Sequence, residues 1–465
     1  MSSRVAPTKL PIGRSLAVIA ILGAIACVAL SDDPVVRIAG ISGASIVLFA
    51  TRALPEVVTA SATFLAFIAI AAAPNEVIFS GFATGGFWLL FAGLIIGAAI
   101  ASTGLGRQIA LRIFQRTGTS YKRAVLFLTG TGLLLGLFVP SAIPRVIVLL
   151  PITLSLAEAM GFRPGSRGCI GLAMTAAIST LMPTYFFLTA NLPVIVQMGA
   201  LENLYGESST YTGFFLYQWP VNLVRLIVLL ALLLPFATAK DAEPQENAGV
   251  EAPSPLNAAQ KRLLAILLVA IGFWVTDFMH GIPPAWIALT TAAVLMIPML
   301  GIVEPTAMKT QIDLSPVFFI AAVFCVSAVA TTSGLSQTLA DALIPRLGLG
   351  EGGSLRDLYA VTGFSVVISH LTTAPATPVV LAPLAGAMAE ATGWPLETVS
   401  MAQAIAIATT VLPYQAPPLV VALALAKIPI AALTRICILL AVATFALGLP
   451  LSWAWWQLLG YFGTG

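Results

Sequence analysis

One fully charged side chain interrupts two apolar segments of this chain. Segments 124–139 and 146–160 are separated by Pro140-Ser141-Ala142-Ile143-Pro144-Arg145, so Arg145 begins the second segment. A guanidinium deep in a membrane costs roughly 3 kcal/mol on insertion scales, so it needs a function or a partner. Its forked N–H donors suit an anionic ligand. The structural alternative is that Arg145 pairs with a carboxylate or caps backbone carbonyl groups.

Neutral oxygen ligands gather at two further interruptions, Met182-Pro183-Thr184 and Pro413-Tyr414-Gln415-Ala416-Pro417-Pro418. Hydroxyl, amide and carbonyl oxygens of this kind suit a substrate carboxylate or a sodium ion equally. The alternative is that they satisfy backbone groups between helices, as Ser and Thr often do in membranes. The candidates are Ser179, Thr180 and Thr184 at the first interruption, with Thr409, Thr410 and Gln415 at the second.

The remaining polar residues favour structural roles. Glu158 and Glu390 each end an apolar segment just before Gly, which is typical of a helix terminus. His370 could take a proton in a proton-coupled cycle, although a lone His near a helix end is more often structural. Asp277 and His280 are expected to be solvated in an outer loop. No nucleophile–base pair, phosphate loop or metal constellation is present, so we expect neither an enzyme nor a cofactor. The four cysteines lie in apolar segments and indicate packing, not disulfides or ligands.

The composition is that of an integral membrane protein. The chain is 59% hydrophobic and 9% charged, against roughly 25% charged for soluble domains. Apolar stretches follow one another from Leu16 to Leu459. Because lipid offers the backbone no hydrogen bonds, spans this apolar must be helices. The net charge of +3 is too small to indicate a nucleic-acid partner.

The second half of the chain repeats the first. Thr103-Gly104-Leu105-Gly106 recurs as Ser333-Gly334-Leu335-Ser336, an offset of 230, and the Ser179–Pro183 segment recurs as Thr409–Pro413. Pro151 and Glu158 recur as Pro383 and Glu390, an offset of 232. A long period in so apolar a chain is the signature of a two-repeat transporter with its site where the repeats meet.

The basic residues predict that the repeats are inverted. The stretch 104–123 carries five Lys and Arg residues and no acid, whereas its counterpart 333–357 carries three acids against two arginines. By the positive-inside rule, the first lies in the cytoplasm and the second outside. Each repeat then has a re-entrant hairpin (124–160 and 356–391) and a broken helix. We expect an all-α protein with about eleven transmembrane helices in the inner (cytoplasmic) membrane, its N-terminus in the cytoplasm.

Six regions follow from this reading. Residues 1–78 form N-terminal scaffold helices, 79–236 form repeat 1, and 237–262 form a cytoplasmic linker. Residues 263–314 are scaffold helices, 315–427 form repeat 2, and 428–465 hold the last span and the C-terminal tail.

Several motifs resemble those of the divalent anion:sodium symporters. They are Phe79-Ser80-Gly81-Phe82, Trp88-Leu89-Leu90-Phe91-Ala92-Gly93 and Ser102-Thr103-Gly104-Leu105-Gly106-Arg107, and the likeness runs from about Leu54 to Lys427. The resemblance implies a homodimer whose scaffold holds mobile transport domains. It also implies elevator-like transport of di- and tricarboxylates or sulfate, usually with sodium.

The resemblance also implies where substrate and sodium bind. The family's Ser-Asn-Thr triplet falls on Ser141-Ala142-Ile143 and on Thr373-Ala374-Pro375, or one residue earlier at Thr372, so the Ser is kept once and both Asn residues are absent. Asn191 lies in a segment similar to the family's Pro-Asn region. The predicted substrate residues, from the resemblance and from the interruptions described above, are Ser141, Arg145, Thr184, Asn191, Thr372, Thr373 and Gln415; the predicted sodium ligands are Ser141, Ser179, Thr180, Thr373, Thr409 and Thr410. Arg145 would supply the charge that sodium otherwise brings.

These observations predict a secondary transporter of small organic or inorganic anions. The alternative in the same superfamily is a cation/proton or arsenite-type antiporter, although a cation site would ordinarily need intramembrane acidic residues. A membrane enzyme or receptor-like scaffold is the alternative from another class. The sequence leaves sodium symport, proton coupling and exchange open.

Overall fold

The computed structural model describes residues 11–115, 120–139, 141–237, 252–303 and 312–463, and all regular structure in these ranges is helical. The first half contains α1 (Pro11–Leu30), α2 (Pro34–Thr51), α3 (Glu56–Ala69), α4 (Asn75–Ile78), η1 (Ser80–Ala83), α5 (Gly85–Thr103), α6 (Leu105–Phe114), α7 (Tyr121–Phe138), α8 (Ala142–Ala159), α9 (Arg167–Ser179), η2 (Pro183–Phe186), α10 (Leu192–Tyr205) and α11 (Tyr211–Leu233).

The second half contains α12 (Ala258–Val275), α13 (Asp277–His280), α14 (Pro284–Leu295), η4 (Pro298–Leu300), α16 (Ser315–Thr332), α17 (Leu335–Leu343), η5 (Ile344–Leu347), α18 (Leu355–Leu371), α19 (Pro378–Thr392), α20 (Leu396–Ile407), η6 (Pro413–Gln415), α21 (Pro417–Ala426), α22 (Ile430–Ala443), the π-helical turn η7 (Thr444–Gly448) and α23 (Leu449–Leu458).

The prediction of an all-α integral membrane protein is confirmed. In the described ranges, ten helices are long and apolar enough to cross a membrane, and several shorter apolar helices accompany them. The hairpin arms α7 and α8 are 18 residues each, longer than the sequence suggested, so they span about 27 Å at 1.5 Å per residue. Their length alone therefore does not show whether α7 and α8 are re-entrant or cross the membrane completely, and the re-entrant hairpin stays a prediction.

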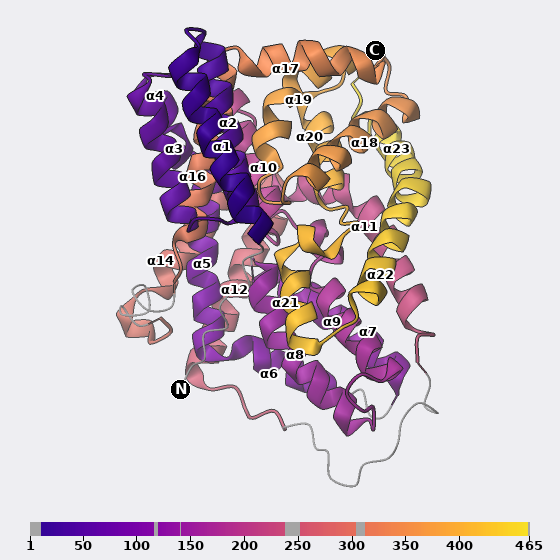
Figure 1. Ribbon diagram of the computed structural model, residues 1–465. Helices are drawn as coiled ribbons and strands as arrows, with labels where there is room; N and C mark the ends of the chain where they lie inside the picture. The colour runs from indigo at the N-terminus through magenta and orange to yellow at the C-terminus, as the bar shows by residue number, and fades with distance from the viewer. Residues whose placement is uncertain (1–10, 116–119, 140, 238–251, 304–311, 464–465) are drawn as a thin grey trace.

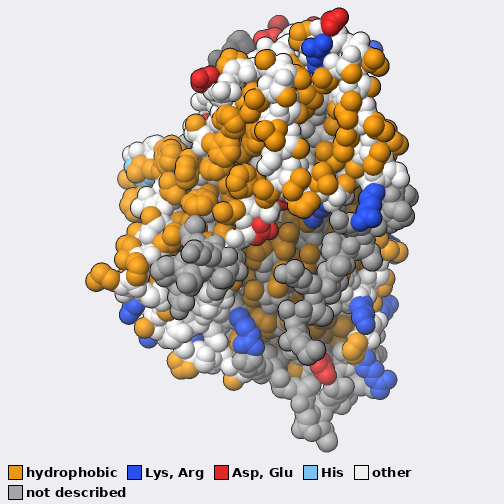
Figure 2. Space-filling model, turned by 60° about the vertical axis from the view of Figure 1, so that its left-hand side comes forward, with side chains coloured by type: hydrophobic (Ala, Val, Ile, Leu, Met, Phe, Trp, Pro, Cys, Tyr) orange, Lys and Arg blue, Asp and Glu red, His pale blue; other side chains and the backbone are white. Residues whose placement is uncertain are grey.

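The two halves are arranged with opposite polarity. In Figure 1, α6 and the hairpin α7–α8 lie toward the lower end, and their counterparts α17 and α18–α19 lie toward the upper end. Charge follows the same division. Figure 2 shows acidic side chains together with Lys or Arg at the upper end of one face, and more Lys and Arg than acidic side chains over its lower part. This distribution is the one that the positive-inside rule would give for a lower end in the cytoplasm.

The broken helices join the two halves together. Each starts beside its own hairpin, since α9 packs on α8 and α20 packs on α19. Beyond the break each packs on the other repeat: α21 contacts α8 and α9, and α10 contacts α19 and α20. Figure 1 shows α9 and α21 in the lower half and α10 and α20 in the upper half. The second half of each broken helix therefore packs on the hairpin and the first half-helix of the other repeat.

Proline produces both breaks. In repeat 1, Pro183 follows the end of α9 and Pro193 occupies the first turn of α10; in repeat 2, Pro413 begins η6 and Pro417 begins α21. Proline lacks the N–H that would continue a helix and is tolerated in a first turn. Each break thus exposes carbonyl groups of the preceding half-helix in the interior of the bundle.

Two glycines let α7 approach the first break closely. A methyl group on Gly132 would lie 2.7 Å from the carbonyl carbon of Ser179, and one on Gly136 would lie 2.6 Å from Thr184 Cγ2 and 2.8 Å from Arg145 Nη1. Small residues four apart commonly permit such backbone contact between membrane helices. The hairpin is thereby held against the break of its own repeat.

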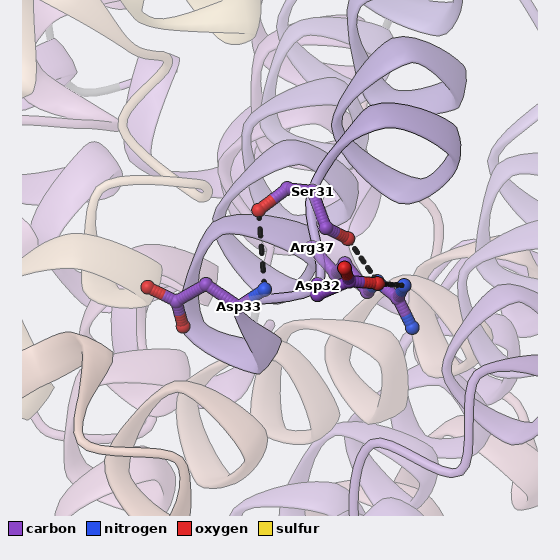
Figure 3. A network of polar contacts seen from close by, with 4 residues as sticks. All are labelled: Ser31, Asp32, Asp33 and Arg37. Atoms are coloured by element: carbon purple, nitrogen blue, oxygen red, sulfur yellow. Dashed lines mark hydrogen bonds and ion pairs between the residues drawn. The ribbon is translucent and has the colours of Figure 1, made fainter.

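Outside the bundle of hairpins and broken helices, α3 packs on α16 and α14 packs on α5. The helices α1 and α2 form a hairpin whose turn is shown in Figure 3. There the Arg37 side chain donates to the carbonyl of Ser31 at 2.6 Å and forms an ion pair with Asp32 at 3.2 Å, while Asp33 caps α2 by accepting from Val35 N at 2.8 Å. Exposed ion pairs contribute little, so this turn is set mainly by its cap.

Two sequence expectations are corrected here. Asp277 was expected to be solvated, but it is 1% exposed, and its Oδ2 accepts from the backbone N–H groups of Tyr211 and Thr212 at the start of α11. A carboxylate near a helix N-terminus satisfies orphan donors and interacts well with the helix dipole. The linker predicted over 237–262 ends earlier, because Asn257 and Gln260 form a capping box and α12 begins at Ala258. Its residues 238–251 lie outside the described ranges, as does Pro140 of the hairpin tip.

Gly132→Ala is expected to destabilise the protein by about 1–3 kcal/mol, since the added methyl group has no room against the Ser179 backbone. Gly130→Ala on the same helix is the matched control, because a methyl group there meets nothing within 4 Å. The measurement is the melting temperature of both purified variants in one detergent. Equal shifts would contradict close contact between α7 and the break.

Asp277→Ala is expected to cost about 0.5–2 kcal/mol of stability through loss of the α11 cap, whereas Asp277→Asn keeps an acceptor and should cost less. Thermal unfolding of the two variants beside wild type measures the difference. A loss as large for Asn as for Ala would contradict a cap that acts by hydrogen bonding.

Candidate functional site

Arg145 is buried at the first break. It lies in the first turn of α8 with 1% of its surface exposed. Its Nη2 donates to the backbone carbonyl of Ala190 at 2.8 Å and to Asn191 Oδ1 at 2.9 Å. Asn191 is the N-cap residue of α10. The hairpin tip and the second half of the broken helix are thus joined through one guanidinium.

Three of the predicted substrate residues form one network. Asn191 Nδ2 donates to Thr184 Oγ1 at 3.0 Å, and Thr184 Oγ1 in turn donates to the carbonyl of Leu181 at 2.6 Å. Asn191 is 2% exposed and Thr184 is fully buried. Arg145, Asn191 and Thr184 were predicted from separate motifs, and the structure brings them together. Ser141, half-buried at the N-cap of α8, lies at the same tip.

Arg145 keeps donors that the described residues do not satisfy. Its Nε and Nη1 are shielded from solvent and have no hydrogen-bond partner, which leaves three of its five N–H groups unused. It forms no ion pair with a described carboxylate. Buried donors without partners are costly, at about 1–3 kcal/mol for each group. A buried cation with unused donors is the arrangement expected of a site that an anion completes.

A cavity of about 300 Å³ adjoins Arg145. It lies between α5, α6 and the two hairpin arms, and its walls are glycine and aliphatic residues such as Gly97, Leu135 and Val148. Arg145 contributes to its wall, as does Arg107 on α6. This volume is at the lower end of the range for small-molecule sites. The cavity therefore adjoins Arg145, and its walls are mainly apolar.

The second hairpin tip is more fully bonded. Thr372 Oγ1 and Thr377 Oγ1 are 2.9 Å apart, and Thr377 occupies the position equivalent to Arg145 at the offset of 232. Gln415 accepts from the N–H groups of Val411 and Leu412 at 3.1 Å and donates to the carbonyl of Ser369 at 3.2 Å. Gln415 thus ties this tip to its break, while Thr373 on the tip is half-buried.

Four of the six predicted sodium ligands lie at the ends of the first half-helices. Thr180 is fully buried and donates to the carbonyl of Ala177 at 2.9 Å, and Ser179 is also fully buried and donates to Leu128 and Ala176 carbonyls at 3.4 Å. At the equivalent places in repeat 2, Thr409 and Thr410 are 2% and 4% exposed. Their role in binding an ion stays a prediction.

Sequence reasoning missed a second buried arginine, Arg225 on α11. It is 1% exposed and makes four hydrogen bonds: Nε to Thr444 Oγ1 at 3.0 Å, Nη1 to Asn222 Oδ1 at 3.0 Å, and Nη2 to the carbonyl of Ile405 at 3.0 Å and to Thr409 Oγ1 at 2.7 Å. The signal was available, since an arginine inside an apolar run is as costly as Arg145. The described ranges therefore contain two buried arginines, Arg145 and Arg225.

Neither buried arginine has a carboxylate partner in the described ranges. Four charged side chains are buried in the described ranges, and the other two are Asp277 and Asp357. Asp277 caps α11, and Asp357 bonds Ser354 at the start of α18. Both carboxylates serve helix N-termini, so neither neutralises the arginines.

The other candidates from the sequence do not join this cluster. Glu158 and Glu390 are exposed at the ends of α8 and α19. His370 ends α18, where its Nδ1 lies 2.6 Å from the carbonyl of Val366. One further polar contact was not anticipated: Gln197 Nε2 donates to Gln403 Oε1 at 2.6 Å, which joins α10 to α20 across the repeats.

Relatives and structural neighbours of this chain are membrane proteins. A Cupriavidus necator protein described only as a membrane protein is 27% identical over 82% of this chain and 76% of its own length. The inner membrane protein YbhI of Escherichia coli is 22% identical over 78% and 79%. The L-tartrate/succinate antiporter of Escherichia coli is 28% identical over 42% of each chain.

Two solved structures share the fold. The YdaH transporter of Alcanivorax borkumensis superposes with a TM-score of 0.60 at 16% identity, over 93% of this chain and all of that one. MtrF of Neisseria gonorrhoeae gives 0.57 at 14% identity, over 95% and 97%. The model of the sodium:sulfate symporter transmembrane region matches residues 10–462, nearly the whole chain. The chain therefore belongs to the sodium:sulfate symporter family, the divalent anion:sodium symporters that its motifs resemble, and is a multi-pass membrane transporter of anions.

Proposed function

We propose that this protein is a secondary active transporter of small anions such as di- and tricarboxylates, sulfate or similar oxyanions. The observation that carries the proposal is Arg145, a buried guanidinium with unused donors and no described carboxylate partner. Anions form strong charge-assisted hydrogen bonds with such a group. Family membership and the name of the L-tartrate/succinate antiporter support the same class of substrate.

In this proposal, Arg145 is the main countercharge of the substrate. The carbonyl of Ala190 and the amide of Asn191 hold its Nη2, so Nε and Nη1 remain for the anion. Ser141 and Thr184 add hydroxyl groups near this point, and Thr372, Thr373 and Gln415 represent the second repeat. In this proposal the two breaks would bring these elements toward a common centre, as expected for transporters with discontinuous helices.

The proposed transport step is an elevator-like motion. The hairpins, the broken helices and the helices α11, α22 and α23 would move as one bundle against a scaffold of α1–α5 and α12–α16. Support comes from the packing, because α3 on α16 and α14 on α5 form contacts within the proposed scaffold. A homodimer in the inner membrane, with the N-terminus in the cytoplasm, completes the proposal.

The alternative is a cation/proton or arsenite-type antiporter of the same superfamily. A cation site in a membrane ordinarily uses paired acidic residues. The two buried carboxylates of the described ranges, Asp277 and Asp357, are both engaged at helix N-termini. The anion transporter is therefore the better supported function.

Arg145→Gln is expected to weaken anion binding by about 2–5 kcal/mol, because it removes one partner of a buried charged pair. The measurement is the thermal shift of the purified protein with succinate, tartrate, citrate, sulfate and a sulfonate, each in sodium and in choline buffer. Arg123→Gln on the exposed first turn of α7 is the matched control and should respond as wild type.

Equal stabilisation of wild type and Arg145→Gln by an anion would make Arg145 structural and contradict its substrate role. A protein that no anion stabilises, but that sodium or a change of pH does, would favour the antiporter.

A further inference from the structure

We propose that Arg225 is a built-in cation at the second break, in the place of a coupling ion, and that the protein performs obligatory exchange of divalent anions without sodium. This inference rests on the proposed anion transport and adds its mode of coupling. It assigns a role to a residue that lies in none of the motifs of the family resemblance.

The first observation is that Arg225 binds oxygens at the second break. The carbonyl of Ile405 belongs to the last turn of α20, and Thr409 lies in the break that follows. In transporters with broken helices, the C-terminal end of a half-helix and the unwound backbone beside it coordinate the coupling cation. The negative end of the helix dipole adds to this preference. In this chain the Arg225 guanidinium already binds both oxygens.

The same geometry disfavours a sodium ion at this break. Thr409 Oγ1, a predicted sodium ligand, is 2.7 Å from Arg225 Nη2. Like charges repel strongly at short range in a buried site. No described carboxylate forms an ion pair with Arg225 to offset that repulsion. The fixed cation and a mobile one therefore compete for the same oxygens.

Arg225 and Arg145 differ in what their donors do. Arg225 uses four of its five N–H groups on Thr444, Asn222, Ile405 and Thr409, whereas Arg145 uses two. Arg225 therefore holds the second break in place, and Arg145 keeps donors for a ligand. The bonds of Arg225 also join α11, α20 and η7, so its charge would move with the proposed bundle.

Charge balance gives the mode of transport. Both guanidiniums are buried and both lack a described carboxylate partner. A divalent anion balances two fixed positive charges, so the loaded bundle carries no net charge from the two arginines and their substrate. The unloaded bundle carries two uncompensated charges, which a membrane interior opposes. The carrier therefore returns only when it is loaded again, and one anion leaves as another enters.

The test uses proteoliposomes with the wild-type protein, and the probes are radiolabelled succinate and sulfate. Vesicles contain either the unlabelled probe or no anion substrate, and each is assayed in sodium, potassium and choline buffer. Uptake is expected only when the vesicles contain anion. The uptake rates in sodium, potassium and choline buffer should agree within about twofold. Loss of one charge-assisted hydrogen bond would change a rate by considerably more than that.

Three variants connect the result to Arg225. Arg225→Lys should retain exchange that needs no sodium. Arg225→Gln should lose about tenfold or more of the exchange rate, or gain stimulation by sodium, since it removes the fixed charge. Arg435→Gln, an exposed arginine on α22, is the matched control. Melting temperatures measured alongside separate lost transport from lost fold.

Sodium-dependent uptake by wild type, or net uptake into vesicles without internal anion, would overturn the exchange mechanism while leaving anion transport intact. These wild-type measurements do not depend on whether a variant folds. Absence of anion flux under every condition would instead contradict the proposed function, and the exchange with it. Unchanged cation-independent exchange by a folded Arg225→Gln would remove Arg225 from the mechanism.

Discussion

The constraint on which this structure depends is that a helix ending inside apolar surroundings must find donors for its last carbonyl groups. Two helices end this way, at the prolines that create η2 and η6. The chain meets part of this need with guanidinium groups from neighbouring helices: Arg225 binds the carbonyl of Ile405 in the last turn of α20, and Arg145 binds the carbonyl of Ala190 in the non-helical segment between η2 and α10. Positive charge at the centre is therefore first a requirement of the backbone, and its use for anions is built on that requirement.

The packing of α7 and α11 allows these two arginine side chains to reach the breaks. Gly132 and Gly136 bring α7 against Ser179 and Thr184, and Gly136 also leaves room for the guanidinium of Arg145. Arg225 reaches the second from α11, beside the π-helical turn that presents Thr444. The two repeats thus use non-equivalent arginines to donate to carbonyl groups at their breaks. The position in repeat 2 that is equivalent to Arg145 is occupied by Thr377. The centre is asymmetric although the helices around it are paired.

Much of the fold could be predicted from the sequence, because repeat offsets and charge asymmetry are properties of order along the chain. The offset of 230 paired α6 with α17 and η2 with η6 correctly. The tip position of Arg145 and the likeness around Asn191 identified two residues that prove to be in contact. The sequence did not predict which residues far apart along the chain contact each other. Thr409 gave no sign of Arg225, which is 184 positions away, and Asp277 looked solvated because it follows an apolar span, although it caps a helix that starts 66 positions earlier.

The crossing of each broken helix into the other repeat has a consequence for biosynthesis. When the ribosome has completed α10, its partner α5 is already made, but its partners α16, α19 and α20 do not yet exist. The buried amide of Gln197 on α10 can form its hydrogen bond only after Gln403, more than 200 residues later, has been synthesised. Contacts of such sequence separation form slowly and leave partly assembled chains exposed. The first half therefore lacks part of its packing surface when it has been inserted. The interface between the repeats forms only after the second half has been made.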